Sequence, residues 1–120
     1  MHISQFSIGA ADIENIRFWF MRYFGMKSSD KHTTSDGEES YRLTCDGDVC
    51  SILIVPLRKG EAPGKARIAM SVGSREGVVS LTEQVRADGC VIITEPSFNV
   101  YEIYRSVVLD PEGNRVSIVE

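Results

Sequence analysis

The sequence lacks several features that assign a chain to a common class of protein. It has only two histidines, His2 and His32, and neither has a second histidine or a carboxylate at a metal-ligand spacing. No run of 18 apolar residues is present, so no membrane-spanning helix is predicted. The N-terminus has no basic segment followed by an apolar one, so no secretion signal is predicted. A net charge of −4 argues against nucleic acid as the main partner. We therefore expect a cytoplasmic protein.

Familiar catalytic motifs are absent as well. The chain contains no G-x-G-x-x-G, no P-loop, no G-x-S-x-G and no H-E-x-x-H. Its three cysteines, Cys45, Cys50 and Cys90, cannot all pair and form no C-x-x-C, so we expect reduced, buried cysteines. A Ser-His hydrolase is not indicated, because no histidine lies where it would serve as the base of a candidate serine.

Two amphipathic helices are predicted. The first spans 12–24, with Asp12 as N-cap and Gly25 as the C-terminal stop. The second begins after Ser74 and stops at Gly89. Apolar residues recur at helical spacing in both, at positions 13, 16, 19, 20, 23 and 24, and at 78, 81 and 85.

Strands are predicted around the helices. In the first half they span 3–9, 26–34, 41–45 and 49–56, with polar turns at 34–39 and 46–48. In the second half they span 66–72, 91–95 and 101–109, with a turn-rich loop at 96–100. A final hairpin turns at 110–114 (DPEGN) into a last strand that carries Val116, Ile118 and Val119.

The two halves follow one pattern, β-α-β-β-β. Their N-caps, helix stops and last turns lie 62, 64 and 66 residues apart, respectively. Two copies of a unit slightly longer than about 60 residues predict an internal duplication rather than a solenoid. The predicted fold is α+β: one domain over 1–120, with module one at 1–57, a linker at 58–65 and module two at 66–120.

These motifs, in this order, resemble a known superfamily. The helix pattern lies at Asp12, Ile13, Glu14, Trp19, Phe20, Phe24, Gly25 and Met26, and the D-P-E-G-N turn lies at 110–114. Together with the segments 68–74, 81–89 and 106–115, they make the chain similar to small bacterial glyoxalase-like members of the vicinal oxygen chelate superfamily. That superfamily groups glyoxalase I, bleomycin-resistance proteins and extradiol dioxygenases.

The resemblance implies a cup of eight curled strands around a ligand. Its enzymes hold a divalent metal with one side chain from the first and one from the last strand of each module, usually His and Glu. Those positions fall here on Gln5, Ser51, Arg67 and Ser117, or on Ile52 in place of Ser51 if the turn shifts by one residue. A catalytic metal needs about three anionic or imidazole ligands, so a metal is possible but disfavoured, and no cofactor is expected.

Other side chains are candidates for the cup. Tyr41, Phe98, Tyr101 and Tyr104 are possible lining residues, although aromatic residues on strands more often belong to the core. Arg67 either binds a carboxylate or another anionic group, or forms an internal ion pair. The resemblance also implies a mobile lid at 96–100 and pairing into a homodimer.

Three functions remain open. The first is a metal-free protein that binds a small polar or anionic molecule in the cup. The second is a divalent-metal-dependent lyase, isomerase or dioxygenase with an atypical site. The third is a scaffold whose cup is filled by side chains. Fold alone does not separate them.

Overall fold

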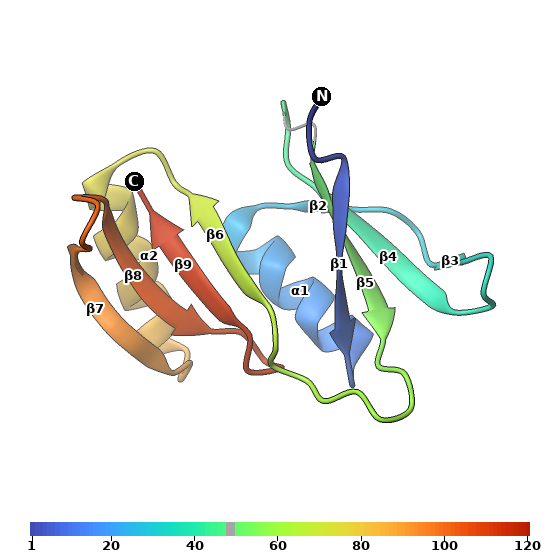
Figure 1. Cartoon of the computed structure of the whole chain (residues 1–120). Helices are drawn as coiled ribbons and strands as arrows, with labels where there is room; N and C mark the ends of the chain where they lie inside the picture. The colour runs from blue at the N-terminus through green and yellow to red at the C-terminus, as the bar shows by residue number, and fades with distance from the viewer. Residues whose placement is uncertain (48–49) are drawn as a thin grey trace. The chain divides into compact units, whose positions relative to one another are not determined.

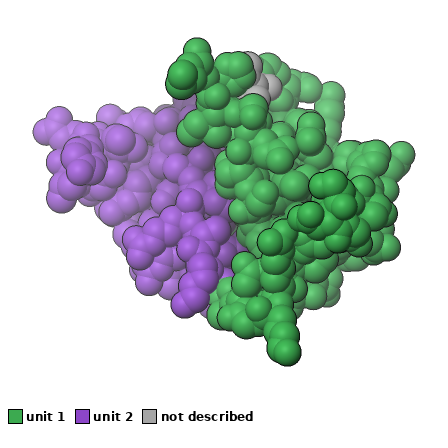
Figure 2. All heavy atoms as spheres, turned by 45° about the vertical axis from the view of Figure 1, so that its right-hand side comes forward, with its two compact units in different colours: residues 1–63 green, residues 64–120 purple. Residues whose placement is uncertain are grey.

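The computed structural model describes residues 1–47 and 50–120 (Figure 1). The chain divides into two compact units, Met1–Pro63 and Gly64–Glu120, which Figure 2 draws in different colours. Their boundary falls inside the segment 58–65 that the sequence predicts as a linker. Whether the two units act as one domain stays a prediction. The predicted end of the turn at 48 and the predicted strand start at 49 lie outside the described residues.

Unit 1 is a sheet with one helix. Its elements are β1 (Gln5–Ala10), α1 (Ile13–Phe24), β2 (Lys27–Ser28), β3 (His32–Thr33), β4 (Glu39–Thr44) and β5 (Ser51–Pro56). The strand order is β1-β5-β4-β2, and β3 pairs with β4. The first and last strands, β1 and β5, are parallel, whereas β4 pairs antiparallel with β5.

Unit 2 repeats this plan. Its elements are β6 (Arg67–Ser71), α2 (Arg75–Ala87), β7 (Ile92–Phe98), β8 (Tyr104–Leu109) and β9 (Arg115–Val119). The strand order is β6-β9-β8-β7, again with the first and last strands parallel and adjacent. The predicted duplication and the α+β fold are therefore confirmed. The closure of the two sheets around one cup stays a prediction.

Each helix begins where its N-cap residue predicts, and α1 also ends at its predicted stop, whereas α2 ends at Ala87 with Asp88 as its C-cap, one residue before Gly89. The Asp12 carboxylate accepts a hydrogen bond from the Asn15 amide at 3.0 Å, and Gly25 ends α1 in the left-handed conformation at φ 61°. Ile16 and Phe20 of α1 are fully buried, and each contributes about 1.5–3 kcal/mol through the burial of its apolar side chain. The helix is thus held to one face of its sheet by its apolar stripe.

The second helix uses the same devices. The Ser74 hydroxyl accepts from the Gly77 amide at 3.0 Å, and Val78 and Val85 are fully buried. Inside this core the hydroxyls of Thr82 and Ser106 lie 2.7 Å apart, and Thr82 also donates to the Val78 carbonyl at 2.6 Å. This pair ties α2 to β8 by a buried hydrogen bond.

The DPEGN turn is locked by its first and last residues. One carboxylate oxygen of Asp110 accepts from the amides of Glu112 and Asn114, both at 2.9 Å, and the other accepts from the Asn114 side-chain amide at 2.8 Å. The side-chain oxygen of Asn114 (Oδ1) in turn accepts from the Ala66 backbone amide at 2.9 Å. The turn that marks the C-terminal hairpin therefore also holds the start of β6.

The predicted and observed strand boundaries differ most in three places. The strand expected at 26–34 is two short strands, β2 and β3, and both pair with β4. The loop expected at 96–100 belongs partly to β7, which runs to Phe98. Proline is tolerated there because β7 is an edge strand with register shifts between 92 and 97. The strand expected from 101 begins at Tyr104, because the Asn99 side chain accepts from the Tyr101 and Ile103 amides and closes a turn.

Two further observations concern the chain as a whole. Among the residues described, no helix has the length and apolar character needed to cross a membrane. Cys45, Cys50 and Cys90 are partly buried, and within the described residues none of the three forms a disulfide.

Candidate functional site

The candidate site lies on the open faces of the two sheets, which we define as the face of each sheet that the helix of the same unit does not cover. Alternation along each strand separates these faces. In unit 1, Ile52 and Ile54 of β5 point to α1 and are buried, while Leu53 and Val55 point to the open face.

Gln5 and Ser51 lie directly opposite each other on the open face of unit 1. They are partners in the parallel register of β1 and β5. Gln5 is exposed, and the Ser51 hydroxyl donates to the Ser4 carbonyl at 3.5 Å. Ile52, the alternative to Ser51, is 3% exposed and packs on the helix side. The strand parity thus favours Ser51 as the residue that shares a face with Gln5.

Unit 1 carries two adjoining cavities on this face, which we call the groove. The first has a volume of about 360 Å³ and is lined by Ser7, Gly9, Thr34, Asp36, Glu38, Leu53, Val55, Pro56, Arg58 and Glu61. The second has a volume of about 430 Å³ and is lined by Ser29, His32, Thr33, Thr34, Ser40, Arg42 and Leu53. They share Thr34 and Leu53. A hollow of this size suits a small organic molecule.

Charges are distributed unevenly along the groove. In the first cavity the Arg58 guanidinium binds Asp36 at 3.2 Å and Glu38 at 3.0 Å, and Glu61 accepts from the Arg58 amide. Hydrogen bonding to Glu38 is the main cause that raises the pKa of Arg58. In the second cavity Arg42 is exposed, and within the described residues its guanidinium forms no ion pair.

Arg67 and Ser117 share the open face of unit 2 but are not opposite each other. Arg67 of β6 pairs with Arg115 of β9, while Ser117 pairs with Ala69. Ser117 therefore lies two residues further along β9 than the position opposite Arg67, whereas Ser51 lies directly opposite Gln5. Arg67 is exposed and Ser117 is half-buried. The role of all four residues in ligand binding stays a prediction.

Three arginines gather on the open face of unit 2. Arg67, Arg105 and Arg115, which we call the arginine cluster, occupy three neighbouring strands at positions of equal parity. Arg105 donates to the carbonyl and hydroxyl oxygens of Ser97 at 3.1 Å. No member forms an ion pair within residues 64–120, all of which the structure describes, and no aspartate or glutamate occupies a strand position of this face.

The aromatic candidates do not lie together. Tyr41 is 6% exposed and its hydroxyl points to Glu14 of α1, so it lies on the helix side of the sheet, where strand aromatics of a core usually lie. Phe98 and Tyr104 form an edge-to-face pair with ring centroids 5.2 Å apart, beneath the Arg75 guanidinium at the start of α2. Tyr101 is 80% exposed in the loop after β7. A role of these three in binding stays a prediction.

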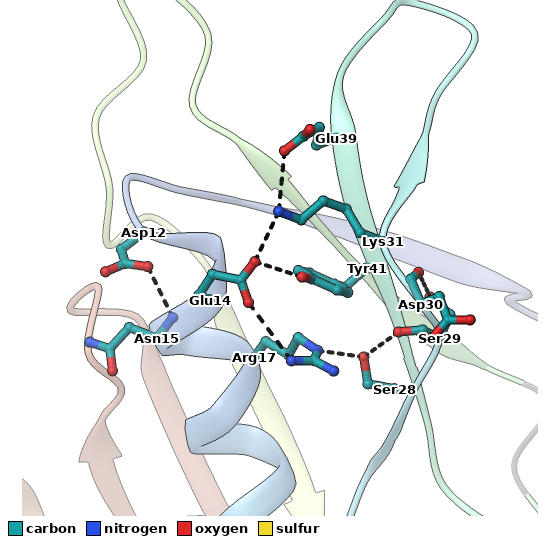
Figure 3. A network of polar contacts seen from close by, with 10 residues as sticks. All are labelled: Asp12, Glu14, Asn15, Arg17, Ser28, Ser29, Asp30, Lys31, Glu39 and Tyr41. Carbon is teal, nitrogen blue, oxygen red and sulfur yellow. Dashed lines mark hydrogen bonds and ion pairs between the residues drawn. The ribbon is translucent and has the colours of Figure 1, made fainter.

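Tyr41 belongs instead to a polar network on the helix side of unit 1 (Figure 3). Its hydroxyl donates to Glu14 at 2.6 Å, and Lys31 binds Glu14 at 3.2 Å and Glu39 at 3.4 Å. The Arg17 guanidinium lies 4.3 Å from the Tyr41 ring centre. The hydrogen bond to Tyr41, with smaller contributions from Lys31 and Arg17, lowers the pKa of Glu14, and the same bond raises the pKa of Tyr41. These contacts link β4 to α1 through Glu14.

A divalent metal does not fit the four positions that the family uses. Gln5 offers an amide oxygen, Ser51 and Ser117 offer hydroxyls, and Arg67 offers a fixed cation with no lone pair. Within residues 1–47 and 50–120, no group of three or more His, Cys, Asp or Glu side chains could hold a metal ion. No chemical step through a metal follows from these residues.

The lining residues of the groove, and Arg105 and Arg115 of the arginine cluster, were not predicted from the sequence. Arg115 precedes Ser117 by two residues, so strand parity alone would have placed it on the same face. Arg42 and Arg105 required the pairing of β4 and β8, which the sequence did not settle.

The fold is that of several solved proteins. TnmS3, an antibiotic-binding protein from Streptomyces sp. CB03234, superposes with a TM-score of 0.81 at 17% identity, covering 99% of this chain and 94% of that one. A glyoxalase/bleomycin resistance protein/dioxygenase superfamily member from Sphaerobacter thermophilus DSM 20745 superposes with a TM-score of 0.82 at 14% identity, covering 100% and 97%. A possible glyoxalase from Bacillus cereus gives a TM-score of 0.75 at 20% identity, covering 100% and 99%.

Sequence comparison defines the family. No curated protein matches the chain significantly. The profile of the Glyoxalase/Bleomycin resistance protein/Dioxygenase superfamily matches residues 2–118, which is nearly the whole chain. The chain therefore belongs to the glyoxalase/bleomycin resistance protein/dioxygenase superfamily.

Proposed function

We propose that this protein binds a small polar or anionic molecule on the open faces of its sheets, without a catalytic metal. The observation that carries the proposal is the arginine cluster of unit 2. Three guanidinium groups on one face, with no carboxylate partner in their unit, favour an anionic ligand, because guanidinium binds carboxylate or phosphate through paired hydrogen bonds.

The chemistry of the four family positions supports binding over metal-dependent turnover. Gln5, Ser51 and Ser117 provide neutral hydrogen-bonding groups, and Arg67 would repel a dication. A relative of the same fold, TnmS3, is described as an antibiotic-binding protein. A sequestering function, in which a small molecule is held and not converted, is consistent with both points.

The test is a thermal-shift screen with anionic metabolites and antibiotics, in buffer with and without EDTA. We expect hits that carry a carboxylate or phosphate and that stabilise the protein equally in both buffers. Arg67→Ala and Arg115→Ala should each weaken binding of the hits about tenfold or more, equivalent to about 1.4 kcal/mol.

Arg22→Ala is the matched control, since it removes the same charge from the last turn of α1 in unit 1. It should bind the hits like the wild type. Hits whose binding is unchanged in both Arg67→Ala and Arg115→Ala would refute the anion site. Stoichiometric nickel, zinc, iron or manganese in protein purified without chelators would refute the metal-free function.

A further inference from the structure

The groove of unit 1 presents charges of opposite sign at its two cavities. The first cavity is lined by Asp36, Glu38 and Glu61 against a single cation, Arg58, so its charged groups sum to −2. The second cavity has Arg42 as its permanent charge and no carboxylate in its lining. The two cavities meet at Thr34 and Leu53. The groove therefore has a net negative charge at one end and a positive charge at the other.

The floor between the two charged parts is apolar. Leu53 lines both cavities, and Val55 follows it on the same face of β5. Leu53 pairs with Ser7 on one side and with Arg42 on the other, so this leucine lies between the hydroxyl of one strand and the guanidinium of the next. A ligand across the groove would place an apolar segment over Leu53 and Val55.

The two ends of the groove differ in whether their charged groups already form ion pairs within the protein. At the acidic end, Arg58 forms ion pairs with both Asp36 and Glu38, so these two carboxylates are held around one cation. The Glu61 carboxylate forms no ion pair within the described residues, but it accepts a hydrogen bond from the Arg58 backbone amide at 2.6 Å. Arg42, by contrast, has no ion pair within the described residues. A bound anion would supply a partner for Arg42, and a bound ammonium would reduce the excess negative charge around Arg58.

We propose that the ligand of the groove is dipolar, with an anionic group at Arg42, a protonated amine at the Asp36–Glu38–Glu61 end and an apolar segment between them. The inference rests on the proposed small-molecule binding function and names the chemical class of the ligand. It does not depend on the arginine cluster, because every residue of the groove belongs to unit 1.

The probes are dipeptides with two apolar side chains, such as Leu-Phe, in four forms: free, N-acetylated, C-amidated and blocked at both ends. Binding is followed by chemical-shift changes of the ¹⁵N-labelled full chain at concentrations up to about 10 mM, where weak millimolar binding is detectable. We expect the free form to bind about tenfold more tightly than either singly blocked form, with shifts at the amides of Ser7, Leu53 and Arg42. Equal binding of all four forms, shifts confined to residues outside the groove, or no shifts with any form would overturn the proposal.

Variants assign the two ends. Arg42→Ala should remove the preference for a free carboxylate and leave the preference for a free amine, whereas Asp36→Asn combined with Glu61→Gln should do the reverse. Arg22→Ala and Glu76→Gln change the same charges on the helices and should behave like the wild type. Unchanged preferences in the groove variants would overturn the proposal.

The two proposals fail separately. If dipeptide binding ignores Arg42 while anionic hits still require Arg67, the dipolar groove is wrong and the anion site on unit 2 stands. If the dipeptides depend on Arg42 but no hit responds to Arg67→Ala or Arg115→Ala, the groove stands and the arginine cluster is not a ligand site.

Discussion

Asp110 is the residue whose removal should most clearly weaken the C-terminal hairpin. Its carboxylate accepts three hydrogen bonds, at 2.9, 2.9 and 2.8 Å, and the side chain is 5% exposed. Each such bond contributes about 1 kcal/mol net, and a buried donor left without a partner costs about 1–3 kcal/mol. Asn114, 1% exposed, would lose the partner of both its backbone and side-chain amides. We expect Asp110→Ala to lower the free energy of unfolding by about 3 kcal/mol.

The isosteric variant separates hydrogen bonding from shape. Asp110→Asn keeps an oxygen for the amides of Glu112 and Asn114 but places its NH₂ against the Asn114 side-chain amide, so it should cost about 1–2 kcal/mol. Urea denaturation followed by far-UV circular dichroism measures both variants. A loss below about 1 kcal/mol in Asp110→Ala would contradict the role assigned to this carboxylate.

The contribution of Asp110 to folding stability should decrease as the pH rises. Burial raises the pKa of Asp110 above its ordinary value of 3.8, although the hydrogen bonds from Asn114 and Glu112 oppose this. The folded state therefore holds the proton more tightly than the unfolded chain, and stability falls as pH rises from below 3.8 through the folded pKa. The stability difference between wild type and Asp110→Asn should accordingly decrease as pH rises across this window, and a difference that increases would refute the assignment.

Three further outcomes are expected. Thr82→Val leaves the Ser106 hydroxyl without its 2.7 Å partner and should cost about 1–2 kcal/mol in urea denaturation, whereas adding Ser106→Ala should recover part of the loss. The phenol of Tyr41 should titrate above its ordinary value of 10.0 in ultraviolet absorbance, and Glu14→Gln should lower that pKa; no change would show that the 2.6 Å bond does not form in solution. Light scattering should give the mass of two chains, as expected of the family, and the mass of one chain would exclude the homodimer.

Part of the site could be predicted because strand parity depends only on the local backbone. The family resemblance places Gln5 and Ser51 at matching positions, strand parity favours Ser51 over Ile52, and the register puts Gln5 and Ser51 opposite each other on the open face of unit 1. The face of Tyr41 could not be predicted from the sequence, because it depends on the register of β4 against β5, where Tyr41 pairs with Ile54 on the helix side. The groove was not predicted at all, since its lining comes from β1, β3, β4, β5 and three connecting segments.

The sequence by itself determined the α+β class, the two copies of one βαβββ unit, both helices with their N-caps, and the family. These features rest on local signals, namely helical periodicity, capping side chains and turn residues, which need no partner from a distant part of the chain. The tertiary structure alone decided that β7 continues through Pro96, that Arg115 rather than Ser117 pairs with Arg67, and that Arg42 and the carboxylates around Arg58 lie along one groove. Each of these depends on pairing between segments far apart in sequence, and a shift of one residue in that pairing would move every side chain of a strand to the other face.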